Sequence, residues 1–268
     1  MNVLFIGGGN MATAIIGGLY RQPGTTISVV EHSEEKRDAL AAKYGVTALS
    51  ALPAALSADD VIVLAVKPQN LKAVCTELAP RLNGALLVSI AAGVDIATLS
   101  RWSGGTTRIV RVMPNTPALV GKGVSGLYAA ADVAVADRNA AEAIMTAVGR
   151  VLWVGTESGI DDVIAVSGSG PAYVFHFVEA LEAVGRDVGF DAETARQLAL
   201  ETFEGAIALL RDSGEPAGEL KRKVMSKGGT TERAIASFED DRVKEAIVRG
   251  ALACRARAVE MSADFSRS

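Results

Sequence analysis

Residues 1–155 alternate between short apolar runs and segments of helix length, and this alternation constrains the fold more than any other feature of the sequence. Two of the runs, residues 3–6 and 61–66, are apolar at every position. Strands with this pattern are buried on both faces, as in a parallel sheet that is covered by helices. We therefore predict a doubly wound α/β domain with a mostly parallel sheet. The expected strands are 2–6, 26–30, 60–66, 85–90, 108–112 and 151–154, and the expected helices are 10–21, 33–44, 69–81, 95–102 and 137–148.

The pattern changes near residue 155, after which the apolar residues recur at helical spacing. Residues 172–178 are apolar on nearly every side, so a helix there must be covered all round. The remaining 113 residues (268 − 155) are few for that purpose, and a second subunit is the expected cover. We predict domains at 1–155 and 156–268, with the second mediating a homodimer. Its helices are expected at 170–188, 191–213, 217–225, 230–239 and 241–264.

The first apolar run leads directly into Gly7-Gly8-Gly9-Asn10-Met11-Ala12, which fits the pattern G-x-G-x-x-A at the start of an expected helix. The first glycine permits a tight turn, the second lets the backbone approach a pyrophosphate, and the small third residue allows the helix to pack on the strand. Backbone N–H groups at the helix start then bind the anion. This predicts a dinucleotide site that includes Gly7, Gly9, Asn10, Met11 and Ala12, and the alternative is a purely structural glycine turn.

The second expected strand ends at Val30-Glu31, where an acidic residue usually binds the ribose 2′-hydroxyl and favours NAD. The side chains of His32, Ser33, Lys36 and Arg37 follow, and these are suited to a 2′-phosphate. Alternatively, Ser33 caps a helix and the charges form its solvated face. The residues alone leave NAD and NADP open.

Composition and charge exclude several classes of protein. A net charge of −4 and an aromatic content of 5% argue against nucleic-acid binding, which needs a basic face or a stacking platform. The sequence shows neither a signal-peptide pattern nor an apolar run of about 18 residues, so we expect a cytoplasmic protein without a membrane partner. The two cysteines and two histidines have no ligand spacing, so we expect no metal site.

Four further motifs, in a fixed order, point to a family. Ala65-Val66-Lys67-Pro68-Gln69 and Arg111-Val112-Met113-Pro114-Asn115-Thr116-Pro117 each end an expected strand, at the sheet edge where nucleotides bind. Ser167-Gly168-Ser169-Gly170-Pro171-Ala172-Tyr173 and Ser226-Lys227-Gly228-Gly229-Thr230-Thr231 follow in the second half. Together with the glycine loop, this set closely resembles pyrroline-5-carboxylate reductase over essentially the whole chain.

The resemblance implies reduction of 1-pyrroline-5-carboxylate to L-proline by hydride transfer from NAD(P)H, the last step of proline biosynthesis. It implies an N-terminal Rossmann domain and an α-helical C-terminal dimerisation domain, with dimers that can assemble as a decamer of five dimers. NADPH is the cofactor that the resemblance favours, and NADH is possible. Two departures stand out: Lys227 replaces the usual proline of the S-P-G-G-T loop, and Glu31-His32 replaces the frequent Asn-Arg.

The resemblance and the chemistry together give the expected site. We expect the substrate carboxylate to bind in the loop of residues 226–231, with Thr231 as the catalytic group near the ring nitrogen; a simple Gly-Gly turn is the alternative. We expect residues 113–116 to form the pocket floor, unless they are only a proline-bracketed turn. Residues 167–173 either start a helix near the cofactor or only allow close helix packing. The expected substrate-binding residues are Met113, Asn115, Ser226, Gly228, Gly229, Thr230 and Thr231, and the further cofactor contacts are Glu31, Ala65, Val66, Lys67, Pro68 and Ala91.

Two other functions compete with this interpretation. An enzyme related to β-hydroxyacid dehydrogenases would carry a catalytic lysine on the interdomain helix, but no lysine occurs between Lys122 and Lys221. A non-catalytic nucleotide-binding protein would keep the glycine loop without needing residues 226–231. The retained second loop therefore favours the reductase.

Overall fold

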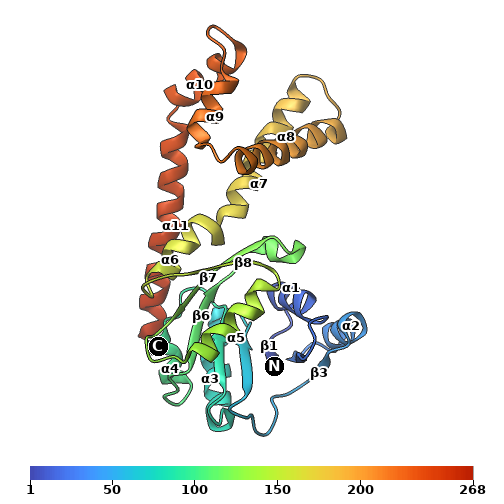
Figure 1. The fold of residues 1–268 in the computed structure, drawn as a ribbon, viewed down its shortest axis with the longest axis vertical. Helices are drawn as coiled ribbons and strands as arrows, with labels where there is room; N and C mark the ends of the chain where they lie inside the picture. The colour runs from blue at the N-terminus through green and yellow to red at the C-terminus, as the bar shows by residue number, and fades with distance from the viewer. Residues whose placement is uncertain (268) are drawn as a thin grey trace. The chain divides into compact units, whose positions relative to one another are not determined.

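The computed structural model describes residues 1–267, and its internal contacts divide the chain into two compact units. The sheet unit comprises Met1–Ser169 together with the residues from Ala253 onward, and the helical unit comprises Gly170–Leu252. These compact units meet at Ser169, and the residues from Ala253 onward belong to the sheet unit. Figure 1 shows both units along the chain.

The sheet unit is built on eight strands in the order β3-β2-β1-β4-β5-β6-β7-β8. All neighbouring strands are parallel except β6 and β7, which are antiparallel. The expected mostly parallel, doubly wound sheet is therefore confirmed. The strands are β1 (Asn2–Ile6), β2 (Thr26–Val30), β3 (Thr47–Leu49), β4 (Asp60–Leu64), β5 (Leu86–Ser89), β6 (Ile109–Met113), β7 (Gly123–Ala129) and β8 (Gly149–Trp153).

Helices cover both faces of this sheet because successive side chains of a strand point to opposite sides. Val3 and Phe5 of β1 belong to one buried cluster, to which α1, α2 and α5 contribute. Leu4 and Ile6 belong to the other, which includes side chains of α3 and α4. The fully apolar runs of the sequence follow from this burial on two faces. The helices are α1 (Asn10–Leu19), α2 (Glu34–Tyr44), α3 (Pro68–Leu78) with the 3-10 turn Ala79–Arg81, α4 (Ile96–Trp102), the 3-10 turn Thr116–Val120 and α5 (Val135–Thr146).

Two strands were not expected from the sequence. The strand β3 has only three residues and pairs on one side alone, with β2, so it carries no strong apolar pattern. The strand β7 contains two glycines, which weaken the strand signal. Gly126 is needed there, because a Cβ atom would lie 2.7 Å from the side chain of Val163 in α6 (Gly159–Val163).

The sheet unit ends in an irregular helical segment that the sequence did not reveal. The helix α6 runs directly into a π-helix, Ile164–Gly168, whose defining bond joins the Ser169 N–H to the Ile164 carbonyl at 2.9 Å. Such i→i+5 turns are rare and often mark functional sites. Ser169 is the last residue of the sheet unit before the helical unit begins, and its Oγ atom lies 3.1 Å from Cys254 Sγ.

The helical unit has almost no core of its own. It contains α7 (Gly170–Asp187), α8 (Ala192–Ser213), α9 (Ala217–Val224), α10 (Thr230–Asp240) and the first part of α11 (Val243–Ser266). In α7 to α10 only Ala195 and Ala199 are buried, whereas Phe175 is 65% exposed. The close approach of Gly185 to Ala195 joins α7 to α8. The apolar faces of these helices are therefore uncovered in the single chain.

The second part of α11 packs within the sheet unit. The Phe265 ring meets the Trp102 ring edge-on at 6.5 Å, and the Arg101 guanidinium donates to the Ser266 carbonyl at 2.9 Å. Gly93 approaches Met261 so closely that a Cβ atom would lie 3.0 Å from the Met261 side chain. Within residues 1–267, no helix is long and apolar enough to cross a membrane.

Candidate active site

The predicted cofactor residues of the sheet unit lie where parallel strands end. The strand order reverses between β1 and β4, and such a switch point, at the carboxyl ends of the strands, is where open α/β sheets bind ligands. Three adjacent backbone bonds join this edge: Gly7 N–H to Val30, Ala65 N–H to Ile6, and Ile90 N–H to Leu64. The loops that follow β1, β4 and β5 therefore begin side by side.

The glycine loop has the shape that a pyrophosphate requires. Gly7 has a φ of +100°, and a Cβ atom would lie 2.8 Å from the Ala65 carbonyl, so only glycine fits. Gly9 is the N-cap of α1; it offers no side-chain cap, and nothing lies within 4 Å of the Cβ position. The start of α1 is therefore not capped by any side chain, and there is room beside Gly9. Ala12 is 1% exposed and belongs to the core, Met11 is half-buried and Asn10 is exposed.

Glu31 closes this loop from the end of β2. Its carboxylate accepts the Gly8 N–H at 2.9 Å and the Ser33 N–H at 3.0 Å. Burial acts to raise the pKa of Glu31, but these two N–H groups and the charge of Lys36 outweigh it, so the pKa is lowered. The carboxylate is therefore held ionised at the glycine loop. Ser33 is the N-cap of α2, as one of the two interpretations of this segment required.

Arg37 is partly engaged by the backbone of the same segment. Its Nη1 atom donates to the Glu31 carbonyl and to the His32 carbonyl, each at 2.8 Å. His32 and Lys36 are exposed. The side chains that were candidates for a 2′-phosphate thus lie in α2 and just before it.

The other predicted cofactor contacts lie after β4 and β5. Ala65 and Val66 are half-buried, Lys67 is exposed and is the N-cap of α3, and Pro68 occupies the first turn of that helix. Proline suits this position because the N–H that it lacks has no partner there. Ala91 is 8% exposed and packs in the second core cluster, so its methyl group supports the loop from below.

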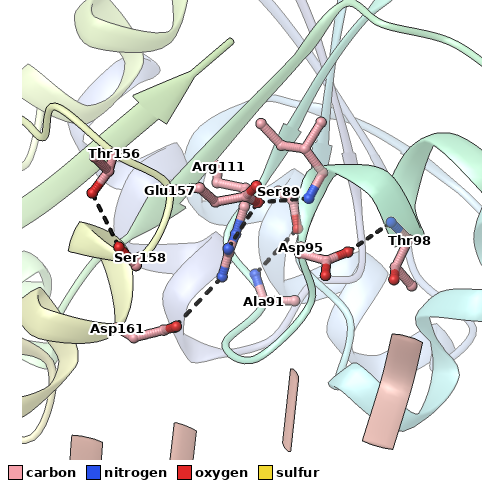
Figure 2. A network of polar contacts seen from close by, with 10 residues as sticks. Ser89, Ala91, Asp95, Thr98, Arg111, Thr156, Glu157, Ser158 and Asp161 are labelled. Carbon is pink, nitrogen blue, oxygen red and sulfur yellow. Dashed lines mark hydrogen bonds and ion pairs between the residues drawn. The ribbon is translucent and has the colours of Figure 1, made fainter. Parts of the chain in front are cut away.

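A buried arginine on β6, which sequence reasoning did not single out, joins three elements near this edge. Arg111 is 3% exposed, and its Nη1 atom donates to Glu157 Oε1 at 2.9 Å. The same oxygen accepts the Ile96 N–H of α4 at 2.7 Å. Figure 2 shows Arg111 pointing between Glu157 and Asp161. The available signal was a charged residue in the apolar run Ile109–Met113, but its partner lies 46 positions away.

Asp161 is the poorly satisfied member of this network. Its Oδ1 atom lies 3.8 Å from Arg111 Nη2, and neither atom has a hydrogen-bond partner among the described residues. Burial raises the pKa of Asp161, and the neighbouring carboxylates of Asp162 and Glu157 raise it further, whereas Arg111 and Arg255 oppose this. The network connects β6 with α4 and α6, but it leaves Asp161 Oδ1 buried without a hydrogen bond.

The two predicted substrate residues that follow β6 have different surroundings. Met113 is half-buried and lies against Gly168 of the π-helix, where a Cβ atom would be 2.6 Å from the methionine methyl group. Asn115 is 7% exposed and bonds to Ser167 and Val124. The structure therefore brings the second and third motifs of the sequence together in the sheet unit.

The remaining predicted substrate residues form a tight turn at the start of α10, in the helical unit. Gly228 has a φ of +74°, and its N–H donates to Glu232 at 2.6 Å. Gly229 is the N-cap of α10, and a Cβ atom there would lie 2.3 Å from Ser226 Oγ. Thr231 is half-buried, while Ser226, Lys227 and Thr230 are exposed. The turn presents hydroxyl and backbone donors at a helix start.

Two family models match this chain. Residues 2–93 match the model described as "NADP oxidoreductase coenzyme F420-dependent", and residues 157–261 match "Pyrroline-5-carboxylate reductase dimerisation". The first match contains the glycine loop and Glu31, and the second contains the turn before α10. Among residues 1–267, no group of three or more His, Cys, Asp or Glu side chains has the arrangement of a metal site.

Relatives extend over nearly the full length. Pyrroline-5-carboxylate reductase of Pseudomonas aeruginosa is 44% identical over 97% of this chain and 96% of its own, and that of Vibrio alginolyticus is 40% identical over 98% of both. The solved pyrroline-5-carboxylate reductase of Coxiella burnetii superposes with a TM-score of 0.88 at 40% identity, covering 97% of this chain and 98% of its own. The Plasmodium falciparum enzyme, solved with NADP bound, gives 0.86 at 28% identity and covers 98% of both chains. The chain therefore belongs to the pyrroline-5-carboxylate reductase family.

Proposed function

We propose that this chain reduces 1-pyrroline-5-carboxylate to L-proline with NAD(P)H, the last step of proline biosynthesis. The observation that carries the proposal is the 44% identity to a reductase of this name over 97% of the chain. The reaction adds a hydride to the imine carbon and a proton to the ring nitrogen, so the C=N bond becomes a C–N single bond. The cofactor is oxidised by two electrons in the same step.

The residues at the glycine loop fit a dinucleotide. No side chain caps the start of α1, so its first N–H groups are available to an anion, and Gly7 lets the backbone approach Ala65 closely. When bound, the nicotinamide supplies the hydride. We assign the pyrophosphate to Gly7, Gly9, Asn10, Met11 and Ala12, and the remaining cofactor contacts to Glu31, Ala65, Val66, Lys67, Pro68 and Ala91.

The turn before α10 is our candidate for the substrate carboxylate. It supplies hydroxyl donors from Ser226, Thr230 and Thr231 beside Gly228 and Gly229, at the positive end of an 11-residue helix. We assign Thr231 to the ring nitrogen, and Met113 to the wall beside the reacting carbon. Hydride transfer to a protonated imine needs no dedicated side-chain acid, so positioning and electrostatics carry most of the catalysis.

The assembly and the location are also part of the proposal. The uncovered apolar faces of the helical unit fit a homodimer, and we propose that five such dimers form a decamer in the cytoplasm. We further propose that the sheet unit binds the cofactor and that the helical unit binds the substrate and the second subunit.

The direct test is the oxidation of NADPH, and separately of NADH, by the purified protein with chemically prepared pyrroline-5-carboxylate. Proline must form in the same molar amount as the oxidised cofactor. A reaction without pyrroline-5-carboxylate is the control for spontaneous oxidation. Turnover with neither cofactor would overturn the proposed function.

A further inference from the structure

One buried amide connects the two sequence motifs that meet in the sheet unit. Asn115 Nδ2 donates to the Ser167 carbonyl at 3.0 Å, and Asn115 Oδ1 accepts the Val124 N–H at 2.8 Å. The residue is only 7% exposed. Its amide therefore has a donor committed to the π-helix and an acceptor committed to β7, which fixes its orientation.

The Ser167 carbonyl needs such a donor for a reason that lies in the sequence. Ser167 is in the last turn of the π-helix Ile164–Gly168, where carbonyl groups run out of donors from their own helix. In an α-helix the donor would be the N–H of residue 171, but that residue is Pro171, which has none. Asn115, 52 positions earlier in the chain, supplies the missing donor.

The clamped turn is also the surface on which Met113 lies. A Cβ atom on Gly168 would be 2.6 Å from the Met113 methyl group, so the methionine lies directly over the backbone of Gly168. Asn115 follows Met113 by two residues and holds Ser167, the neighbour of Gly168. The position of the Met113 side chain thus depends on a bond that Met113 does not make.

We propose that Asn115 is a positioning residue for the reduction: it clamps the π-helix beneath Met113 and so sets the wall against which the reacting ring lies. This rests on the proposed function, which assigns Met113 to that wall. It is separate from the expectation that Asn115 contacts the substrate, which stays a prediction. The clamp is formed by the Nδ2–H group of Asn115, because its Oδ1 atom already accepts the Val124 N–H of β7.

A double-mutant cycle on kcat/KM tests the coupling. Asn115→Asp keeps an acceptor for the Val124 N–H and removes the donor to Ser167, and we expect kcat/KM to fall about tenfold. Met113→Ala is expected to cost a similar factor. Because both changes disturb the same wall, the double variant should lose about tenfold, whereas independent residues would lose about a hundredfold. A loss near the product of the single effects, or no effect of Asn115→Asp, would overturn the proposal.

A second pair keeps the test valid if Asn115→Asp does not fold. Gly168→Ala places a methyl group against Met113, so it should lower kcat/KM in the wild-type background and have little further effect after Met113→Ala. An undiminished effect after Met113→Ala would contradict the coupling. The affinity of each variant for NADPH without substrate, measured by calorimetry, should stay within about twofold of wild type, since a general loss of structure would weaken it. An inactive wild-type protein would instead refute the proposed function. The coupling between Asn115 and Met113 would then be measured from the thermal midpoints of the same single and double variants.

Discussion

Single residues at the sheet edge show how local surroundings decide the role of a side chain. Glu31 is kept ionised by two backbone N–H groups, and Arg111 lies in ion pairs with Glu157 and Asp161. The location of Glu31 beside the glycine loop was foreseeable, because the end of the second strand lies next to that loop in this fold. The role of Arg111 was not, because its partners come from loops far along the chain. The motif that contains a residue therefore predicts where the residue lies in the fold, but it predicts less well which residues it contacts.

Replacing Glu31 tests cofactor discrimination. Glu31→Gln removes one negative charge from the glycine loop while keeping an acceptor for the Gly8 N–H. We expect the ratio of kcat/KM for NADPH to that for NADH to rise about tenfold, because a 2′-phosphate no longer meets a like charge. Glu34→Gln, in the exposed first turn of α2, is the matched control and should leave the ratio within about twofold. An equal ratio in both variants would contradict this role.

Replacing Thr231 tests the turn before α10. A hydrogen bond to a charged group contributes about 1.5–3 kcal/mol, so Thr231→Ala should lower kcat/KM for pyrroline-5-carboxylate by about 10- to 100-fold. Thr231→Ser keeps the hydroxyl and should retain most of the activity. Steady-state kinetics at saturating cofactor measure both variants. Unchanged kinetics of the alanine variant would remove Thr231 from the catalytic site.

Elements with a strong apolar pattern were predictable, and those defined by contacts elsewhere were not. The strands β1 and β2 have the expected bounds, and the expected helices of both halves are present within a few residues. The strand β7 was missed because its Gly126 is chosen by the side chain of Val163, not by strand preference. The π-helix was missed for a similar reason. The carbonyl of Ser167 in its last turn accepts a hydrogen bond from Asn115, which is distant in the sequence. The glycine loop was predictable because glycine is required there by the backbone itself.

The helix α6 carries a pH dependence that can be measured. The pKa of Asp161 is raised in the folded state, so the folded chain binds a proton more tightly than the unfolded chain. Stability is then lost as the pH rises from about 4, the unfolded value, through the raised pKa. Asp161→Asn should therefore raise the thermal midpoint at pH 7 relative to wild type, and the difference should vanish near pH 3.

Asp162→Asn is the control for this prediction. Asp162 is exposed and pairs with Arg255, so its replacement removes this contact as well as a repulsion on Asp161, and the midpoint at pH 7 should rise less than in Asp161→Asn. Thermal unfolding of the three proteins between pH 3 and pH 8 gives the comparison. A midpoint of Asp161→Asn at or below that of wild type at pH 7 would show that the pair with Arg111 outweighs the cost of burial.

At the scale of the whole molecule, the helical unit leaves its apolar faces uncovered in the single chain. Its helices bury two alanines, while large apolar side chains such as Val184 and Leu209 are more than half exposed. Exposed apolar surface on this scale marks an interface. The homo-oligomer expected from residues 172–178 agrees with the dimerisation family that covers residues 157–261.

A pair of matched variants tests this interface. Phe175→Glu places a charge on α7, where the side chain is 65% exposed, and should shift the protein towards a monomer of 27.8 kDa. Val135→Glu makes the same kind of change at a 72% exposed position of α5 and should leave the assembly intact. Sedimentation at several concentrations measures the masses and also separates a dimer from a decamer. Wild-type protein that sediments as a monomer would contradict the interface.

The path of α11 has a consequence for synthesis of the chain on the ribosome. Residues 1–169 of the sheet unit are made first, but Phe265 and Ser266, which contact Trp102 and Arg101, are made only after the helical unit. The 96 residues from Gly170 to Phe265 (265 − 169) take about 5–20 s to translate. For that time Trp102 lacks the ring that covers it in the finished protein. The sheet unit is therefore complete only after the helical unit between its two parts has been made.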